Sequence, residues 1–184
     1  WTISHEAVNP DHWEERNWKL RSNLPGGRSG SGVFAPDPIN GDCETNLQNG
    51  VISLESPVIT LPDFTEGTYQ LTFHHYVATE NRYDGGNIKY SLNGGEWTIV
   101  PIYAFEHNQY NTTLVNSGND NPLRGQRAFS GTDGGSLGGS WGQSVVNLSE
   151  FGVTSGSTIQ FKFDFGTDGC NGNDGWYIDV VKLI

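Results

Sequence analysis

The sequence predicts an all-β protein, a jelly-roll β-sandwich of two antiparallel sheets with little helix. Three observations support this prediction. Several short segments alternate between apolar and polar residues, with the period of two that half-buried strands have. Turns rich in Gly, Asn and Asp separate these segments, and the chain of 184 residues contains 25 glycines. A helical period is credible only over residues 14–20 and 148–151, for one or two turns at most.

The first clear strand signals lie in residues 50–62 and 68–77. Pro57 interrupts the first segment, and because proline cannot donate to a sheet ladder, the break suits an edge strand or a bulge. The second segment alternates along its whole length. One face would carry Tyr69, Leu71, Phe73 and His75, and the other would carry Gln70, Thr72, His74 and Tyr76.

A hairpin is predicted between residues 87–92 and 96–100. Asn93-Gly94-Gly95 connects them, and both central residues of a type I′ turn need the positive φ that Asn and Gly tolerate. Further strands are predicted at residues 144–148, 158–165 and 176–184. The polar segment 111–142 is too long for a hairpin connection, and we expect it to carry function or local structure.

The composition is that of a folded, acidic domain. Six Trp, seven Tyr and nine Phe supply apolar area that disordered chains lack. The net charge of −11 opposes binding to nucleic acid or to an anionic membrane surface, and no apolar run is long enough to enter a bilayer. We expect one domain over residues 1–184. Because the chain begins at Trp1 and contains no Met, we expect it to be excised from a larger secreted protein.

Cys43 and Cys170 are the only cysteines, so only one disulfide pairing is possible. Each lies in a turn with Asp and Gly, where a bridge is easily accommodated. A bridge would stabilise the fold by roughly 4 kcal/mol in the chain-entropy model. It would also place the protein outside the cytoplasm, secreted or at the cell surface. Two reduced, buried thiols are the alternative.

Glycine-rich and aromatic motifs occur at residues 30–38, 41–43, 83–95, 139–144 and 163–179. The last reads Phe-Asp-Phe-Gly-Thr-Asp-Gly-Cys-Asn-Gly-Asn-Asp-Gly-Trp-Tyr-Ile-Asp. Together these motifs resemble the MAM-like jelly-roll modules of secreted bacterial proteins, which accompany fungalysin-type and other extracellular metallopeptidases. The resemblance spans most of the chain. It implies a non-catalytic accessory domain, often with structural calcium, and no particular ligand.

The chain departs from that family at the end of its last motif. Family members often have two consecutive acidic residues there, whereas here Val180 follows Asp179. Any ion bound by Asp179 must therefore take its other ligands from elsewhere in the chain.

Calcium is the predicted cofactor, because it takes six to eight oxygens from carboxylates and from backbone carbonyls at turns. Asp84, beside a tight turn, and Asp179, on an apolar strand, are the strongest candidate ligands. Taken one at a time, each acid has a solvated surface position as its alternative. Residues 168–174 have an EF-hand-like spacing but lack the flanking helices and the closing Glu. The full candidate set is Asp37, Asp42, Glu55, Glu80, Asp84, Asp174 and Asp179.

The sequence contains no complete catalytic motif. His5-Glu6 begins a His-Glu-x-x-His pattern, but Asn9 occupies the position of the second histidine. His74 and His75 are adjacent in a strand and point to opposite faces, so they cannot share one metal without distortion. The serines near glycine, in Ser29-Gly30-Ser31-Gly32 and Ser140-Trp141-Gly142-Gln143, do not lie in a Gly-x-Ser-x-Gly motif at a strand-to-helix turn. We therefore predict that the protein is not an enzyme.

Four aromatic residues in polar contexts are candidates for ligand contact, because a ring there could stack on a sugar or anchor a peptide. They are Tyr103, Phe105, Tyr110 and Trp141. Burial in the core is the alternative for each.

The predicted function is that of a secreted, calcium-stabilised, non-catalytic accessory or adhesion domain that binds a polysaccharide or an extracellular protein. A stand-alone hydrolase of an extracellular polymer and a purely structural spacer or assembly subunit are the alternatives.

Overall fold

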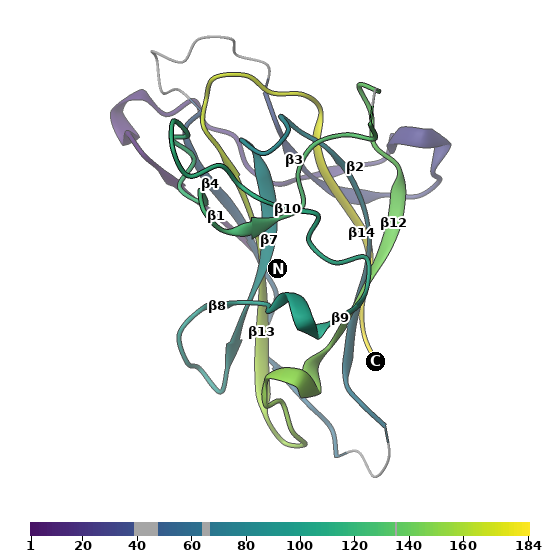
Figure 1. Ribbon diagram of the computed structural model, residues 1–184. Helices are drawn as coiled ribbons and strands as arrows, with labels where there is room; N and C mark the ends of the chain where they lie inside the picture. Colours follow the sequence, from purple (N-terminus) through teal and green to yellow (C-terminus); the bar gives the residue numbers. More distant parts are fainter. Residues whose placement is uncertain (39–47, 64–66, 135) are drawn as a thin grey trace.

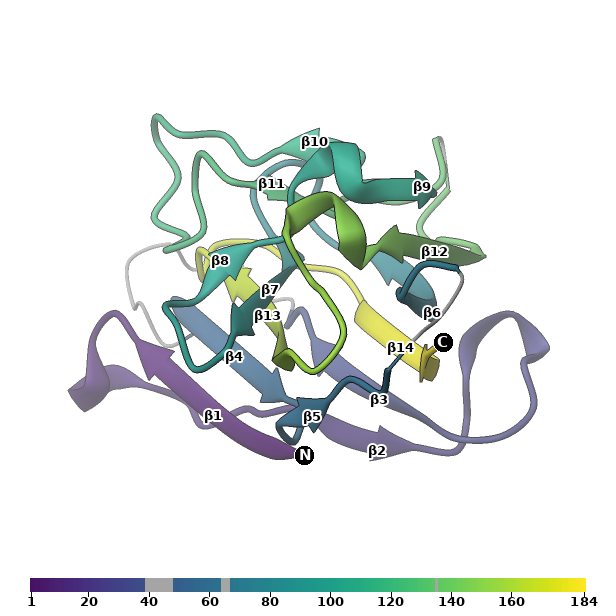
Figure 2. The ribbon, with the colours of Figure 1, turned by 90° about the horizontal axis from the view of Figure 1, so that it is seen from below.

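Two antiparallel sheets form the structure, a computed structural model that describes residues 1–38, 48–63, 67–134 and 136–184. They face each other in two layers (Figures 1 and 2). The first sheet has the order β1 (Thr2–Ala7), β4 (Gly50–Glu55), β13 (Thr158–Thr167), β7 (Gly85–Leu92) and β8 (Thr98–Ile99), with β5 (Ile59–Thr60) also paired to β13. The second has the order β2 (Lys19–Arg21), β3 (Gly32–Pro36), β14 (Gly175–Leu183), β6 (Gln70–Ala78), β12 (Trp141–Asn147) and β9 (Phe105–His107). A short ladder joins β10 (Thr112–Thr113) to β11 (Arg127–Ala128). The all-β sandwich predicted from the sequence is thus confirmed.

Helical structure in the described ranges is limited to short 3-10 turns. They are η1 (Pro10–His12), η2 (Pro25–Gly27), η3 (Ile102–Ala104) and η4 (Leu148–Phe151). The turn considered at 148–151 is η4. The helical turn considered at 14–20 is not formed. Arg16 and Trp18 are buried there, and β2 begins at Lys19. The Trp18 indole, for example, is buried and donates to the Ile52 carbonyl at 3.2 Å.

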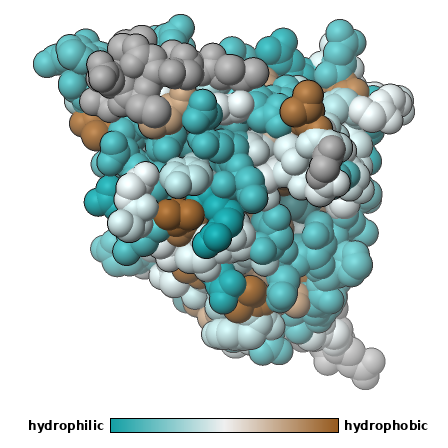
Figure 3. All heavy atoms as spheres, turned by 45° about the horizontal axis from the view of Figure 1, so that its top comes forward, coloured by the Kyte–Doolittle hydropathy of each residue, from teal (hydrophilic) through white to brown (hydrophobic). Residues whose placement is uncertain are grey.

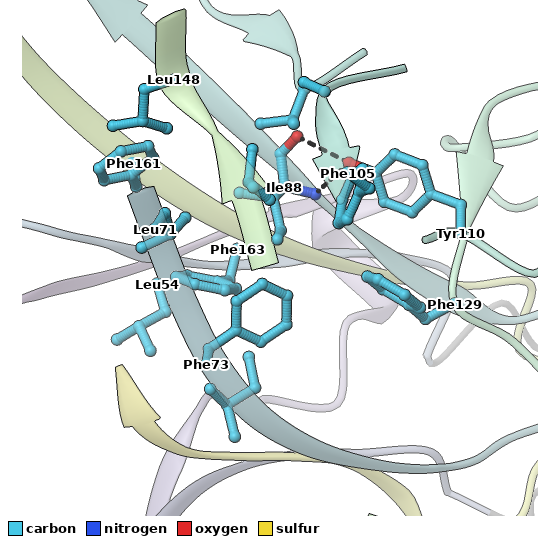
Figure 4. Close-up of a cluster of buried hydrophobic side chains, with 14 of the residues drawn as sticks. Leu54, Leu71, Phe73, Ile88, Phe105, Tyr110, Phe129, Leu148, Phe161 and Phe163 are labelled. Carbon is cyan, nitrogen blue, oxygen red and sulfur yellow. Dashed lines mark hydrogen bonds between the residues drawn. The ribbon is translucent and has the colours of Figure 1, made fainter. Parts of the chain in front are cut away.

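The hydrophobic core fills the space between the two sheets. Phe73 of β6 and Phe163 of β13 are fully buried, and their rings meet edge to face with centroids 5.5 Å apart. Figure 4 shows this contact and the Tyr110 hydroxyl, which bonds the backbone N–H and C=O of Ile88, each at 3.2 Å. Each large apolar side chain buried in this way contributes about 1.5–3 kcal/mol. The predicted face that carries Tyr69, Leu71, Phe73 and His75 therefore points into the core.

The predicted hairpin is present between β7 and β8. Asn93 and Gly94 have φ of 52° and 72°, the two positive values that a type I′ turn requires. Lys89 pairs with Ile99 across the turn.

Gly86 of β7 allows the Trp176 ring of β14, in the other sheet, to approach closely. A Cβ added there would lie 2.3 Å from the Trp176 ring and 2.9 Å from the Asp164 carbonyl. Trp176 is fully buried, so its ring has no room to move aside. The sequence therefore needs glycine here for space.

We expect Gly86→Ala to lower the free energy of unfolding by about 1–3 kcal/mol, because overpacking forces the Trp176 ring or the backbone to shift. Urea unfolding monitored by tryptophan fluorescence measures this change. Gly134→Ala is the matched control, because nothing lies within 4 Å of its added Cβ. A loss for Gly86→Ala no larger than that of the control would contradict the packing argument.

Candidate functional site: a buried carboxylate cluster

Four acidic residues meet at one end of the sandwich. Asp37 follows β3, Glu80 and Asp84 lie in the turn between β6 and β7, and Asp168 follows β13. The register explains why they meet: Gly175 of β14 pairs with both Pro36 and Ala78, and Gly166 of β13 pairs with Gly85. The ends of these strands, from both sheets, therefore lie at the same end of the sandwich. In Figure 1 this is the upper end, which the loop between β13 and β14 crosses.

Three carboxylates of this acidic cluster, which consists of Asp37, Glu80, Asp84 and Asp168, are close enough to share one ion. One oxygen from each of Glu80, Asp84 and Asp168 lies within 4.8 Å of the other two. The carboxyl group of Asp37 lies beside that of Asp84, and the two groups influence each other's pKa. Asp37 and Asp84 are only 1% and 0% exposed, so water does not screen their charges.

Backbone N–H groups hold one oxygen of several of these carboxylates. Asp37 Oδ2 accepts from the N–H of Glu80 at 2.9 Å and of Asn173 at 3.0 Å. Asp84 Oδ1 accepts from the N–H of Asp168 at 2.8 Å. The turn between β6 and β7 is thereby tied to Asp37 and to the loop between β13 and β14.

The remaining oxygens are the unusual feature of the cluster. Asp37 Oδ1, Glu80 Oε2 and Asp84 Oδ2 are buried and have no hydrogen-bond donor among the described residues. A buried acceptor without a partner costs about 1–3 kcal/mol, and more when it is charged. Three such atoms in one cluster therefore need a proton or a cation.

Burial and mutual repulsion raise the pKa of the carboxyl groups. Burial is the main cause for Asp37, whose pKa rises to about 6. The pKa of Asp84 rises well above its ordinary value, through burial first and then through the charges of Asp37 and Asp168. Burial also raises the pKa of Glu80 and Asp168. Ionising these carboxyl groups therefore costs more free energy in the folded protein than in the unfolded chain.

Arg16 is the buried cation nearest to this charge. Its guanidinium donates to the carbonyls of Gln48 at 2.9 Å and Pro36 at 3.3 Å, and to the hydroxyl of Thr167. Burial lowers its pKa to about 10, so it is still charged at neutral pH, and it attracts Asp37 and Asp84. One guanidinium does not balance four carboxylates.

Among the described residues, the other predicted metal ligands do not place a carboxylate in the cluster, although the Asp174 carbonyl accepts from the N–H of Asp37 at 3.0 Å. Asp179 forms an ion pair with Arg28, with 2.8 Å between Nε and Oδ2. Glu55 is at the end of β4, level with Thr2 and Lys162. The side chain of Asp174 accepts from the Tyr177 hydroxyl at 3.1 Å. Asp42 lies outside the described residues.

The structure thus brings together Asp37, Glu80 and Asp84 from the predicted set and adds Asp168, which sequence reasoning missed. A signal for Asp168 was present. It follows the predicted strand 158–165 closely, just as Glu80 follows the predicted strand 68–77, and acids placed after neighbouring strands meet at one sheet end.

The four predicted ligand-contact aromatics do not share a surface. Phe105 and Tyr110 are buried in the core, with ring centroids 4.8 Å apart (Figure 4). Tyr103 is 68% exposed on η3. Trp141 begins β12, where the Arg28 guanidinium lies 4.4 Å from its ring centroid.

The predicted disulfide joins a described residue to one that is not. Cys43 lies outside the described residues. The backbone N–H of Cys170 donates to Asp168 Oδ1 at 3.0 Å, so this cysteine lies beside the cluster. The pairing remains a prediction.

The serine–histidine contact in the core does not have the geometry of a nucleophile and its base. Ser144 Oγ lies 3.0 Å from His75 Nε2 but donates to the Asn108 carbonyl. His75 Nδ1 accepts from the Trp176 indole, so Nε2 carries the ring proton and cannot act as a base. Burial lowers the pKa of His75 to about 3. The contact is a buried structural network.

No protein-family model matches the chain, and no curated protein matches it. Three solved structures resemble it over nearly its whole length. The C-terminal CBM6 of LamC, a marine laminarinase from Zobellia galactanivorans, is 18% identical over 99% of this chain and 98% of that chain, with a TM-score of 0.37. A cleaved adhesin domain of Lys-gingipain from Porphyromonas gingivalis is 16% identical over 96% and 89%, with a TM-score of 0.43. Another cleaved adhesin domain of Lys-gingipain is 14% identical over 97% and 88%, with a TM-score of 0.38. We draw neither family nor function from similarities of this size.

Protein stripped of metal with EDTA should become less stable as the pH rises from about 4 to about 7. Over this window the folded cluster keeps protons on Asp37 and Asp84 that the unfolded chain has already lost, because both pKa values are raised by folding. Urea unfolding at several pH values measures the slope, and Asp84→Asn should reduce it. A stability that rises across the same window would contradict the electrostatic description of the cluster.

Proposed function

We propose that the protein is a calcium-stabilised, non-catalytic β-sandwich domain of an extracellular protein, with the role of binding a polysaccharide or a protein surface. The observation that supports calcium most directly is the set of buried, unpartnered oxygens on Asp37, Glu80 and Asp84. Asp37 and Asp84 are each more than nine-tenths buried. A cation bound here would supply the partner that these atoms lack.

The donor set fits calcium better than the other common ions. It consists of carboxylate oxygens, and no His or Cys belongs to the group of described residues close enough to share an ion. Zinc sites are built mainly from nitrogen and sulfur, whereas calcium prefers oxygen. Magnesium requires a near-ideal octahedron and keeps several waters, which an enclosed site does not favour.

The charge balance also supports a divalent ion. Four ionised carboxylates and Arg16 leave three uncompensated negative charges, and calcium would reduce them to one. A proton shared between Asp37 and Asp84 is the competing way to relieve their repulsion, and the raised pKa of both groups favours it increasingly as the pH falls.

The accessory role is supported by the motif resemblance and by the chemistry that the site offers. Asp37 and Asp84 are buried, so a substrate cannot reach their carboxylates, and the Ser144–His75 pair lacks a free base. No helix among the described residues is long and apolar enough to cross a membrane. An extracellular location follows from the resemblance and from the predicted disulfide.

Calcium should raise the melting temperature of EDTA-treated protein by roughly 5–10 °C when its concentration is about 100 times Kd, because binding to the folded state alone contributes about 2.7 kcal/mol. Differential scanning calorimetry at neutral pH measures the shift, and magnesium at the same concentration should give a smaller one. Superimposed curves with calcium and with EDTA would overturn the calcium proposal.

Two variants separate the cluster from the other candidate ligand. Asp84→Asn should abolish the calcium-dependent shift, because it removes a charged ligand at the centre of the cluster. Asp179→Asn is the matched control. Asp179 pairs with Arg28 away from the cluster, so the shift should remain and the stability should change by no more than about 1 kcal/mol. The reverse result would assign the ion to Asp179.

A further inference from the structure

A small polar pocket opens next to the turn that carries Glu80 and Asp84. Its volume is about 170 Å³. This is well above the roughly 30 Å³ that one water takes in the liquid, and below the roughly 300 Å³ at which pockets for drug-sized ligands begin. The pocket therefore suits a molecule of about one sugar ring. Its lining includes His75, Asn108, Asn111, Phe129, Asp133 and Ser140.

The lining chemistry favours a neutral molecule with many hydroxyl groups. Asparagine amides, a serine hydroxyl and the Asp133 carboxylate supply both donors and acceptors, and the Phe129 ring supplies an apolar floor. No lysine or arginine is among the described residues that line the pocket. With a net charge of −11 on the chain, an anionic ligand would be repelled. A hexose presents hydroxyls at its edge and C–H groups on its faces, which matches this lining.

The pocket is held in shape before any ligand arrives. Asn108 lies on the surface in a left-handed conformation with φ of 49°. Its backbone carbonyl accepts from the Ser144 hydroxyl at 2.7 Å, and its side-chain amide lies 2.9 Å from Nε2 of His75, a buried ring that accepts from the Trp176 indole. Asn111 bonds both the backbone N–H and the C=O of Ser130, at 3.0 and 2.8 Å. Groups held in this way lose little conformational entropy when a ligand binds.

The surface around this end of the molecule is predominantly hydrophilic, with scattered apolar side chains (Figure 3). This face therefore has no extended apolar patch in the part of the surface that Figure 3 shows. Recognition through hydrogen bonds in a pocket is consistent with such a surface.

Hydrogen bonds join the wall of the pocket directly to the acidic cluster. The Ser130 hydroxyl lies 2.6 Å from the carbonyl of Asp84 and 3.2 Å from that of Glu80. Thr79 accepts from the N–H of Gly131 at 2.9 Å and donates to the Asp84 carbonyl at 3.0 Å. The turn 79–84 therefore carries cluster carboxylates on its side chains and supports the pocket wall with its backbone.

From these contacts we infer that the pocket binds one residue of a neutral carbohydrate, and that the cation of the acidic cluster strengthens this binding by fixing the turn 79–84. This inference rests on the proposed function and specifies its ligand and its site. The cation acts through Ser130 and Thr79 and does not touch the sugar. Because coupling between two sites is reciprocal, the sugar should tighten calcium binding by the same factor.

The test begins with calcium-loaded protein and soluble probes: glucose, galactose, mannose and their neutral oligosaccharides, with galacturonate as the anionic comparison. Isothermal titration should detect at least one neutral probe and not galacturonate. Removing calcium with EDTA should weaken the binding severalfold. Galacturonate binding more tightly than the neutral probes, or affinity unchanged by EDTA, would overturn the inference.

Point variants locate the site. Asn108→Ala and Asp133→Ala should each weaken the neutral probe at least tenfold and leave the calcium-dependent melting shift intact. Gln109→Ala is the matched control, because Gln109 is exposed beside Asn108 and is not part of the lining. Ser130→Ala should reduce the calcium dependence of sugar binding, with a melting curve recorded to verify that this variant is folded.

The outcomes separate the two proposals. Normal sugar binding by Asn108→Ala and Asp133→Ala would overturn the pocket and leave a carbohydrate-binding domain with another site. No binding of any neutral probe, with calcium stabilisation intact, would overturn the carbohydrate ligand and leave the calcium proposal standing.

Discussion

Electrostatic repulsion among buried carboxylates is the constraint on which this end of the molecule depends. Asp37, Glu80, Asp84 and Asp168 come from three segments of the chain, and the ends of both sheets converge on them. Backbone N–H groups satisfy one oxygen of Asp37 and of Asp84, and other oxygens of the cluster have no described donor. The fold therefore gathers negative charge that it does not neutralise. A bound cation would turn this repulsion into a link between the two sheets.

The turn 79–84 connects the acidic cluster to the polar pocket. Its side chains belong to the acidic cluster, and its carbonyls accept hydrogen bonds from Ser130 and Thr79 at the edge of the polar pocket. A change in the charge of the cluster thus reaches the pocket through a few direct contacts. The hydrophobic core provides the rigid support, because Trp176 and Phe73 leave the strands beneath the turn no freedom to shift. Stability and recognition then share one structural element.

Much of the fold could be predicted from the sequence, but the composition of the site could be predicted only in part. The alternation in β6 and the turn at Asn93-Gly94 are local signals, and local signals survive in a single sequence. Strands β1 and β2 are mostly exposed edge strands, so they lack the apolar alternation that would have revealed them. The contact of Asp37 with Asp84 and the membership of Asp168 depend on strand register across two sheets. The polar neighbours of Phe105 and Tyr110 concealed the burial of both rings.

A crystal structure of the protein grown at neutral pH with calcium tests the central claim most directly. We expect one ion bound by Glu80, Asp84 and Asp168, with Asp84 Oδ2 and Glu80 Oε2 among its ligands. Its identity can be verified from the anomalous signal and from metal–oxygen distances of about 2.3–2.6 Å. A cluster without an ion, in which Asp37 and Asp84 share a proton at neutral pH in the presence of calcium, would contradict the account.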